Sequence, residues 1–445
     1  MLDIKFIREN KEKIKTAAKN KNINLDLDKL LELDGERRGL KSKIDEIRAA
    51  RNRLAAELKK GKPSDEQIAQ GRKYKEQIAE LELKLNEINE QYLELMAKVS
   101  NIPSDDTPIG RDENDNVEIY KWGEPTKFKF KPKSHIELAE ELDLIDFKRG
   151  AKVGGYRGYY LKNEAVPLVM GFLTYAMEKL IKKGFTPVMP PTLVKEFALF
   201  GSGYFAGKKY NPEVDEIYKI ANDEKLADGT LKKEDRFLIG TAEPALLAYY
   251  TDEILDIKNL PIKLVGFSQC YRSEIGSYGK DTKGIYRVHE FMKIEQAIIC
   301  PADIELSDKL HQEMIELSKE LHKDLGLPFR QIQICTGDMG AGKYKMFDLE
   351  AWIPSRSGYG ETGSASNFLD WQSRRLNVKY KDKNGDKKFV YMLNNTALPT
   401  PRILIAILEN YQQADGSVEI PKVLRKYMPG KMKVIKKIDR HCERT

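Results

Sequence analysis

The chain is poor in the residues that build disulfide scaffolds and metal centres. Its 445 residues include only four cysteines, which stand far apart and form no CxxC pair. A disulfide framework and a zinc site are therefore not expected, and the cysteines are interpreted as reduced, buried thiols. No apolar run is long enough to cross a membrane, and the first fifteen residues contain acids and lack the apolar centre of a secretory signal. These absences favour a soluble, cytoplasmic protein with no membrane partner.

Charge is abundant but almost balanced. Charged residues make up 33% of the chain, hydrophobic residues make up 41%, and the formal net charge is +7. This balance alone supports nucleic-acid binding only weakly. A chain of this length is long for one hydrophobic core, and its patterns divide it in two. We expect a helical unit at residues 1–105 and a mixed α+β unit at residues 106–445.

Residues 30–99 carry the heptad pattern of a coiled coil. Apolar residues recur at alternating three- and four-residue steps over 30–58, and again over 68–99 after a Gly-Lys-Pro-Ser break. Two such seams of similar length predict an antiparallel helical hairpin that projects as an arm. Ser64, followed by Gln67, predicts a capping box at the start of the second helix.

The far end of this predicted arm is basic. Residues 37–75 have a net charge of +8, whereas acidic residues predominate from 76 to 100. Most coiled coils carry such charges for solubility, but here the positive charge gathers at one end and two seam positions are arginine. Basic groups placed in this way could reach nucleic-acid phosphates. The candidate contacts are Arg37, Arg38, Lys41, Arg48, Arg51, Arg53, Lys59 and Lys60.

The segment 267–299 is typical of two apolar strands joined by a loop rich in glycine and positive charge. Arg272 and Glu274 stand where the first strand ends, and Glu295 lies within the second. A buried strand seldom carries so many ionisable groups unless a ligand or an opposite charge pairs them. The pattern predicts an anionic substrate held over a sheet. Upstream, residues 222–236 are polar and turn-rich, and predict a surface excursion before a strand.

Three further segments combine polar side chains with predicted helix or strand ends. A Thr-Ala-Glu segment is typical of a helix start, with Thr241 as the N-cap and Glu243 at the positive end of the dipole. Glu361 and the nearby Ser364 hydroxyl could bind Mg²⁺ when phosphate oxygens supply the remaining ligands. Arg402 falls in the first turn of a predicted helix, where a cation is unfavourable without an anionic partner.

In this order, the segments resemble the motifs of the class II aminoacyl-tRNA synthetases, and within that class the seryl-tRNA synthetases. Residues 270–296 resemble motif 2, with Tyr-Arg-Ser-Glu, Gly-Ser and Asp-Thr elements followed by Arg-x-His-x-Phe-x-Lys-x-Glu. Residues 184–191 resemble motif 1, which alone predicts a short buried strand, and residues 394–413 resemble motif 3. The resemblance implies an α+β fold in which an N-terminal antiparallel α-helical coiled-coil arm precedes a class II synthetase-like antiparallel β-sheet catalytic domain flanked by helices.

This resemblance implies a serine–tRNA ligase. Such an enzyme activates L-serine with ATP to form seryl-adenylate, and transfers the seryl group to the 3′ end of tRNA(Ser), with tRNA(Sec) as a further candidate substrate. ATP is the implied nucleotide substrate and Mg²⁺ the implied cofactor. The coiled-coil arm would bind the tRNA, and motif 1 implies a homodimer.

The resemblance also implies roles for individual residues. The catalytic residues would be Arg272, Glu295 and Arg402. The serine contacts would be Thr241, Ala242, Glu243, Glu295 and Thr396. The ATP contacts would be Arg272, Ser273, Glu274, Arg287, Val288, Phe291, Glu361, Thr362, Gly363, Ser364 and Arg402, with Glu361 and Ser364 also holding Mg²⁺. Two positions depart from the family pattern, since Thr396 stands in place of serine and Gly360 where arginine is common.

Two other functions remain open at this point. One is a related enzyme that activates an amino acid but loads it onto a carrier protein, against which the basic arm argues. The other is a catalytically silent RNA-binding paralogue. The presence of Arg272, Glu295, Glu361 and Arg402 argues against it, because a silent site has no use for buried charge.

Overall fold

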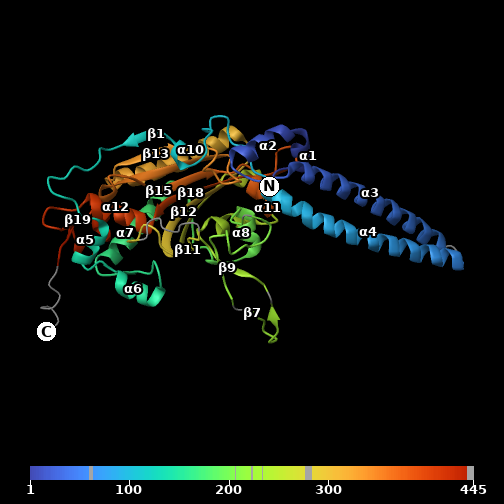
Figure 1. Ribbon diagram of the computed structural model, residues 1–445, viewed down its shortest axis with the longest axis horizontal. Coiled ribbons are helices and arrows are strands. Elements are labelled where there is room, and N and C mark those ends of the chain that lie inside the picture. The colour runs from blue at the N-terminus through green and yellow to red at the C-terminus, as the bar shows by residue number, and fades with distance from the viewer. Residues whose placement is uncertain (60–63, 206, 222–223, 233, 276–282, 438–445) are drawn as a thin grey trace. The chain divides into compact units, whose positions relative to one another are not determined.

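The structure of the chain is a computed structural model that describes residues 1–59, 64–205, 207–221, 224–232, 234–275 and 283–437 (Figure 1). The predicted tRNA contact Lys60, the Gly-Ser and Asp-Thr elements of the motif 2 segment and Cys442 lie outside these residues. The chain forms two compact units, Met1–Ser100 and Asn101–Thr445, so the break falls a few residues before the expected boundary at 105.

The N-terminal unit consists of α1 (Ile4–Glu9), α2 (Lys11–Asn20), α3 (Leu27–Leu58) and α4 (Asp65–Lys98). The two long helices α3 and α4 lie side by side as the predicted antiparallel hairpin (Figure 1). The predicted capping box is confirmed, because Ser64 Oγ accepts from Gln67 N at 3.2 Å and Gln67 Oε1 accepts from Ser64 N at 3.0 Å. None of the helices in the described part of the chain is long and apolar enough to span a membrane.

The second unit is built on a sheet whose described strands run antiparallel to their neighbours, except for the parallel pair β11 and β4. In spatial order the strands are β1 (Val117–Trp122), β13 (Phe329–Gln333), β14 (Lys345–Ile353), β15 (Gly358–Asn367), β18 (Tyr391–Pro399), β12 (Glu290–Cys300), β11 (Ile262–Tyr271) and β4 (Thr186–Val188). The predicted antiparallel catalytic sheet is therefore confirmed, and β11 and β12 are the two strands expected within 267–299.

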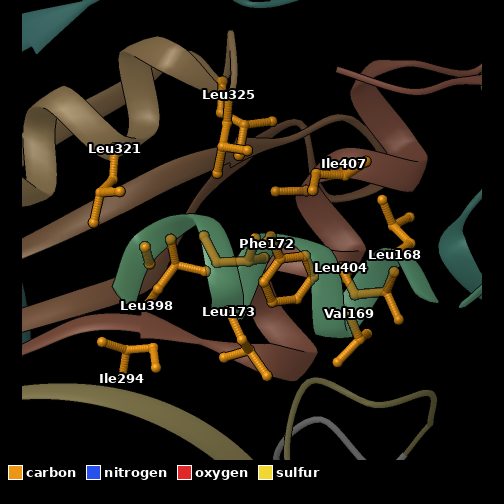
Figure 2. Close-up of a cluster of buried hydrophobic side chains, with 14 of the residues drawn as sticks. Leu168, Val169, Phe172, Leu173, Ile294, Leu321, Leu325, Leu398, Leu404 and Ile407 are labelled. Atoms are coloured by element: carbon orange, nitrogen blue, oxygen red, sulfur yellow. The ribbon is translucent and has the colours of Figure 1, made fainter. Parts of the chain in front are cut away.

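One face of this sheet packs on long helices, and the other carries the polar groups of the site beside a smaller hydrophobic cluster. Helices α7 (Ala165–Lys182), α10 (Ile304–Asp324) and α12 (Thr400–Asn410) share a hydrophobic core with the sheet, and Figure 2 shows these side chains gathered around Phe172. Along β12, Ile294 and Ile298 join that core, whereas the alternate residues Lys293 and Glu295 line cavities on the opposite face. Because side chains alternate between the two faces of a strand, consecutive residues of β12 serve the core and the cavities in turn.

The remaining α-helices and strands of this unit lie around this sheet. They are α5 (His135–Glu141), α6 (Phe147–Gly154), α8 (Glu196–Ser202), α9 (Glu243–Leu247), α11 (Trp371–Leu376), β2 (Ile145–Asp146), β3 (Tyr160–Leu161), β5 (Leu193–Lys195), β6 (Tyr218–Lys219), β7 (Glu224–Lys225), β8 (Leu231–Lys232), β9 (Arg236–Leu238), β10 (Ile254–Asp256), β16 (Lys379–Lys381), β17 (Lys387–Phe389), β19 (Val418–Glu419) and β20 (Val434–Ile435). The predicted surface excursion contains the small β7–β8 hairpin. Cys270, Cys300 and Cys335 are buried and free.

One local expectation is wrong. The motif 1 segment forms β4, a strand at the edge of the sheet whose Thr186 and Pro187 side chains are exposed rather than buried. Proline is suited to an edge strand because it has no backbone N–H to donate to a neighbouring strand on the open side. Met189, directly after β4, is 80% exposed.

Candidate active site

Two adjoining cavities open over the polar face of the sheet. We call the first the cationic cavity; it has an empty volume of about 480 Å³ and is lined by Arg272, Glu274, Tyr286, Arg287, Val288, Phe291, Lys293, Glu361, Thr396, Pro399, Pro401 and Arg402. The second, the carboxylate cavity, has an empty volume of about 930 Å³, and its polar lining includes Tyr204, Glu243, Arg272, Lys293, Glu295, Lys343, Glu361, Ser364, Ser366, Asn394 and Thr396. Arg272, Lys293, Glu361 and Thr396 line both cavities and mark where they meet.

A buried cluster around Glu295 forms the floor of this junction. Glu295 is 2% exposed, and its Oε2 atom lies 2.7 Å from Lys293 Nζ. Lys293 also donates to Thr396 Oγ1 at 2.9 Å, and Thr396 and Thr241 donate to Glu295 Oε2 at 3.3 and 3.0 Å. A buried carboxylate is tolerated because a cation and two hydroxyls pair it.

Thr241 does not act as the predicted helix cap. Helix α9 begins after Ala242, its N-cap residue, which makes no side-chain capping bond. Thr241 instead donates its hydroxyl hydrogen to Glu295, and such a charge-assisted bond is stronger than the neutral capping bond it replaces. The expectation of a Thr241 cap is wrong because the acceptor lies 54 residues away in the sequence and cannot be read locally.

Glu243 is the second buried carboxylate of the carboxylate cavity, with 5% of the residue exposed. Its described hydrogen-bond donors are neutral: Gln372 Nε2 to Oε1 at 2.7 Å and Tyr204 OH to Oε2 at 3.2 Å. Burial, with repulsion from Glu295, raises the pKa of Glu243 to about 7. This carboxylate is therefore suited to a ligand that brings a positive charge.

Arginines dominate the cationic cavity. Arg272 donates through Nε to the Gly240 carbonyl at 3.2 Å, and its guanidinium lies 5.5 Å from the centre of the Phe291 ring. Arg402 falls in the first turn of α12, as predicted, and its Nη1 lies 2.9 Å from Glu361 Oε2. It also lies 4.6 Å from the centre of the Tyr286 ring. These groups offer fixed positive charge and aromatic faces, the chemistry that recognises a nucleoside triphosphate.

Glu274 fixes a third arginine. Arg287 Nη1 and Arg157 Nη1 lie 3.3 and 3.4 Å from Glu274 Oε2, and the Glu274 side chain is only 7% exposed. Glu274 thus contributes to the cationic cavity mainly by orienting Arg287. The Arg157 contact comes from a loop that no sequence pattern singled out.

Some predicted residues lie behind the cavity walls. Thr241, Ala242, Ser273, Thr362 and Gly363 are not among the residues that line either cavity. Thr241 acts through Glu295, as described above. The Ser273 backbone N–H donates to the backbone carbonyl of Glu216 at 3.4 Å.

A β-bulge brings the two predicted metal ligands onto one face. Residues three apart on a regular strand face opposite sides, yet Glu361 is paired with Glu350 and Ser364 with Asp348, two residues apart on β14. The register shift lies between Leu349 and Glu350, so β15 carries one extra residue there. Both Glu361 and Ser364 consequently line the carboxylate cavity.

The donors around this bulge suit a hard cation. Asp348, opposite Ser364, is half-buried, and its buried Oδ1 atom has no hydrogen-bond partner among the described groups. Burial, with the charge of Glu361, raises the pKa of Asp348 well above its usual range. Burial also favours a raised pKa for Glu361, but Arg402 outweighs it and the net pKa is lowered. No cluster of three His, Cys, Asp or Glu side chains that could hold a metal occurs in the described chain. An oxygen-only set completed by phosphates fits Mg²⁺.

Several residues that line the cavities escaped sequence reasoning as site residues. Lys293 could have been found, because Phe291, Lys293 and Glu295 are two residues apart on one strand and must share a face. Tyr204 and Lys343 come from irregular segments that carry no periodic signal.

On the arm, the predicted tRNA contacts differ in their surroundings. Arg37 lies 3.9 Å from the centre of the Tyr92 ring and 3.4 Å from the buried Asp34, with 19% of its side chain exposed. Arg38 also pairs with Asp34, at 3.1 Å, and Arg48 with Glu82 of the neighbouring helix at 2.6 Å. The contacts that are exposed at the surface without a described ion pair are Lys41, Arg51, Arg53 and Lys59.

Comparison with known proteins agrees with this arrangement. Residues 1–103 match the model of the seryl-tRNA synthetase N-terminal domain, and residues 225–411 match the tRNA synthetase class II core domain (G, H, P, S and T). The serine–tRNA ligase of Treponema denticola is 42% identical over 434 residues, which is 96% of this chain and 98% of that one.

Two solved structures extend the comparison to three dimensions. Seryl-tRNA synthetase from Pyrococcus horikoshii, complexed with ATP, is 39% identical with a TM-score of 0.86, over 99% of this chain and 100% of the other. Cytoplasmic serine–tRNA ligase from Naegleria fowleri, in complex with AMP, is 30% identical with a TM-score of 0.83, over 99% of each chain. The chain belongs to the seryl-tRNA synthetase family, a group of ligases with a class II core.

Proposed function

We propose that this chain activates L-serine with ATP and transfers the seryl group to the 3′ end of tRNA(Ser). The observation that carries the proposal is the junction of the two cavities at Arg272 and Lys293. One cavity is built for a triphosphate and the other for a small zwitterion, so the serine carboxylate and the α-phosphate would meet between them. The relatives with ATP and AMP in their structures support this assignment.

The first step needs no protein nucleophile. A serine carboxylate oxygen attacks the α-phosphorus in line, the bond from that phosphorus to the bridging oxygen breaks, and pyrophosphate leaves. Arg272 would neutralise charge on the α-phosphate, while Arg287 and Arg402 would hold the β- and γ-phosphates and Phe291 would stack on adenine. Such chemistry depends on positioning and charge more than on proton transfer. In the second step a hydroxyl of the terminal tRNA ribose attacks the acyl carbon, and AMP leaves.

The carboxylate cavity would select serine by its polar groups. Glu295 is already paired by Lys293, whereas the described partners of Glu243 are neutral. We therefore assign the serine ammonium to Glu243, and the serine hydroxyl to the Glu295–Thr396 pair. A site built to bond a hydroxyl rejects alanine strongly because its buried groups are left unpaired. The methyl group of Thr396 would reduce the room for threonine.

Glu361 and Ser364 would hold Mg²⁺, with Asp348 opposite Ser364 on the neighbouring strand β14. When bound, the ion would neutralise phosphate charge. The chain's own contribution is to orient these oxygens through the β15 bulge and to keep Glu361 next to Arg402, at 2.9 Å.

The arm would bind the tRNA through its phosphates. An A-form RNA helix hides its major groove, so shape and backbone contacts dominate its recognition. The exposed Lys41, Arg51, Arg53 and Lys59 are the proposed contacts, whereas Arg37 would mainly hold the base of the hairpin. The same mode of contact would accept tRNA(Sec), the second proposed substrate.

We further propose a cytoplasmic homodimer. The edge strand β4 pairs with β11, and its other side carries no described strand. The helix α7, which contacts β4, has the exposed apolar side chains Val166, Met170 and Ile181, and Met189 directly after β4 is also exposed. A partner subunit would cover this surface.

Amino-acid-dependent ATP–pyrophosphate exchange tests the proposal. The full chain with Mg²⁺ and without tRNA would be assayed with serine, threonine, alanine, glycine and cysteine. Exchange with serine alone is expected. Exchange with a different amino acid would overturn the specificity, and absence of exchange in a folded, ATP-binding protein would overturn the activity.

A further inference from the structure

The β15 bulge is held from the far side of the sheet. Its extra residue is Thr362, which is completely buried, and the Thr362 hydroxyl lies 2.7 Å from His322 Nε2. His322 is also completely buried, on α10, the helix that packs under the face opposite the cavities. The only other described acceptor near this hydroxyl is the Leu349 carbonyl, at the longer distance of 3.3 Å.

The hydrogen-bond pattern fixes the tautomer of His322. Its Nδ1 atom lies 2.8 Å from the Ser318 carbonyl, which can only accept, so Nδ1 carries the hydrogen. Burial lowers the pKa of His322 to about 4, so the ring is neutral and Nε2 is an acceptor. The Thr362 hydroxyl must therefore donate to Nε2, and the chain from Ser318 through His322 to Thr362 is complete and directional.

This chain of bonds bears directly on the metal side of the site. If β15 were a regular strand without the bulge, Glu361 and Ser364 would point to opposite faces of the sheet, because they are three residues apart in the sequence. The side chain of Thr362 faces the helices while its neighbour Glu361 faces the cavity. The hydrogen bond from Thr362 to His322 thus holds the bulge at this position of β15.

We infer that His322 is a positioning residue for the Mg²⁺–ATP site, acting through the Thr362 hydroxyl to hold the bulge that aims Glu361 and Ser364 at one ligand. This inference rests on the proposed function for its ligand. His322 lines neither cavity, and no motif of the sequence singled it out. Partners behind metal ligands commonly tune affinity in this way.

Calorimetric titration of the full chain with ATP, with and without Mg²⁺, tests the inference. Thr362→Val keeps the branched shape and removes the donor, and is expected to weaken binding of ATP in the presence of Mg²⁺ by about tenfold. Binding of ATP in EDTA should stay within about twofold of wild type, because the arginines are untouched. Thr362→Ser keeps the hydroxyl and should restore Mg²⁺–ATP affinity.

His322→Leu removes the acceptor without altering β15, and should reproduce the Mg²⁺-specific loss if Thr362→Val does not fold. His311→Phe is the control, because His311 is also buried on α10 but packs against Phe347, 5.2 Å between ring centres. It should change thermal stability but not the ratio of the two ATP affinities.

Equal weakening with and without Mg²⁺, or wild-type affinity in both Thr362→Val and His322→Leu, would overturn the inference. Serine KM in pyrophosphate exchange should remain unchanged in Thr362→Val, and a matching loss there would indicate general damage and also count against it. The pyrophosphate exchange assay of the wild-type chain separates the failure of this inference from the failure of the proposed function. If the wild type shows no serine-dependent exchange, the proposed function is overturned, and the ATP titration still decides the role of His322.

Discussion

The pH dependence of serine binding should follow the ionisation of Glu243. This carboxylate is buried, its described hydrogen-bond donors are neutral, and burial with repulsion from Glu295 raises its pKa from the ordinary 4.5 to about 7. Only the ionised form would hold the serine ammonium. Because apparent affinity scales with the fraction of competent protein, serine should bind better as the pH rises through 7.

The size of the effect follows from this pKa. About a tenth of Glu243 is ionised at pH 6 and about nine tenths at pH 8, so KM for serine should fall about tenfold over this range. The carboxylate and ammonium groups of free serine do not change charge in that window. Glu243→Gln should raise KM at pH 8 and remove its pH dependence.

Stability should move in the opposite sense. A carboxyl whose pKa is higher in the folded state binds its proton more tightly there, so the free energy of unfolding falls as pH rises from 4.5 to about 7 and levels off above it. At about 1.4 kcal/mol per pH unit, the buried charge costs about 3 kcal/mol at pH 8. Glu243→Gln should therefore be more stable than wild type at pH 8 and similar at pH 5.

The assay is pyrophosphate exchange with varied serine from pH 5.5 to 8.5, with KM for ATP at saturating Mg²⁺ as the internal control, and urea unfolding at pH 5 and 8. A serine KM that is flat, or that rises with pH, would refute the reasoning. So would a Glu243→Gln variant that loses stability at pH 8.

Three other outcomes are expected. Arg272→Ala should lower kcat of serine-dependent exchange by about 10²–10³, as for loss of a transition-state charge donor, and near-normal exchange would refute its α-phosphate role. The double variant Arg51→Glu, Arg53→Glu should leave pyrophosphate exchange intact, raise KM for tRNA and make this KM less dependent on salt. The control Lys98→Glu, near the base of the arm, should show neither change in tRNA binding. Unchanged tRNA charging by the double variant would refute phosphate contacts at Arg51 and Arg53. Met189→Lys should shift sedimentation from dimer to monomer, and an unchanged dimer would show that the interface lies elsewhere.

The arm and the motif segments were readable from the sequence because their signals are local. The heptads predict α3 and α4, Ser64 and Gln67 predict the capping box, and the apolar face after Pro401 predicts α12 with Arg402 in its first turn. Each of these depends on residues within a few positions of one another, where backbone geometry leaves few alternatives.

What the sequence could not predict depends on contacts between distant segments. Thr241 bonds to Glu295 rather than capping α9, and Arg37 lies over Tyr92 of the facing helix. The β15 bulge is a property of pairing with β14, and its partner His322 comes from a helix on the other face. No periodicity along the chain reports such pairings, so the motif residues could be predicted, whereas their orientation and the cavity residues Tyr204 and Lys343 could not.

The most direct test of the two-cavity account is the binding of a non-hydrolysable seryl-adenylate analogue, measured by calorimetry on the full chain. This analogue would occupy both cavities, with the link between its seryl and adenylate parts next to Arg272. It should therefore bind more than about 100-fold more tightly than ATP. The matching alanyl analogue should lose most of that gain because the Glu295–Thr396 pair is left unsatisfied. An affinity no better than that of ATP, or equal affinities for the seryl and alanyl analogues, would contradict the account.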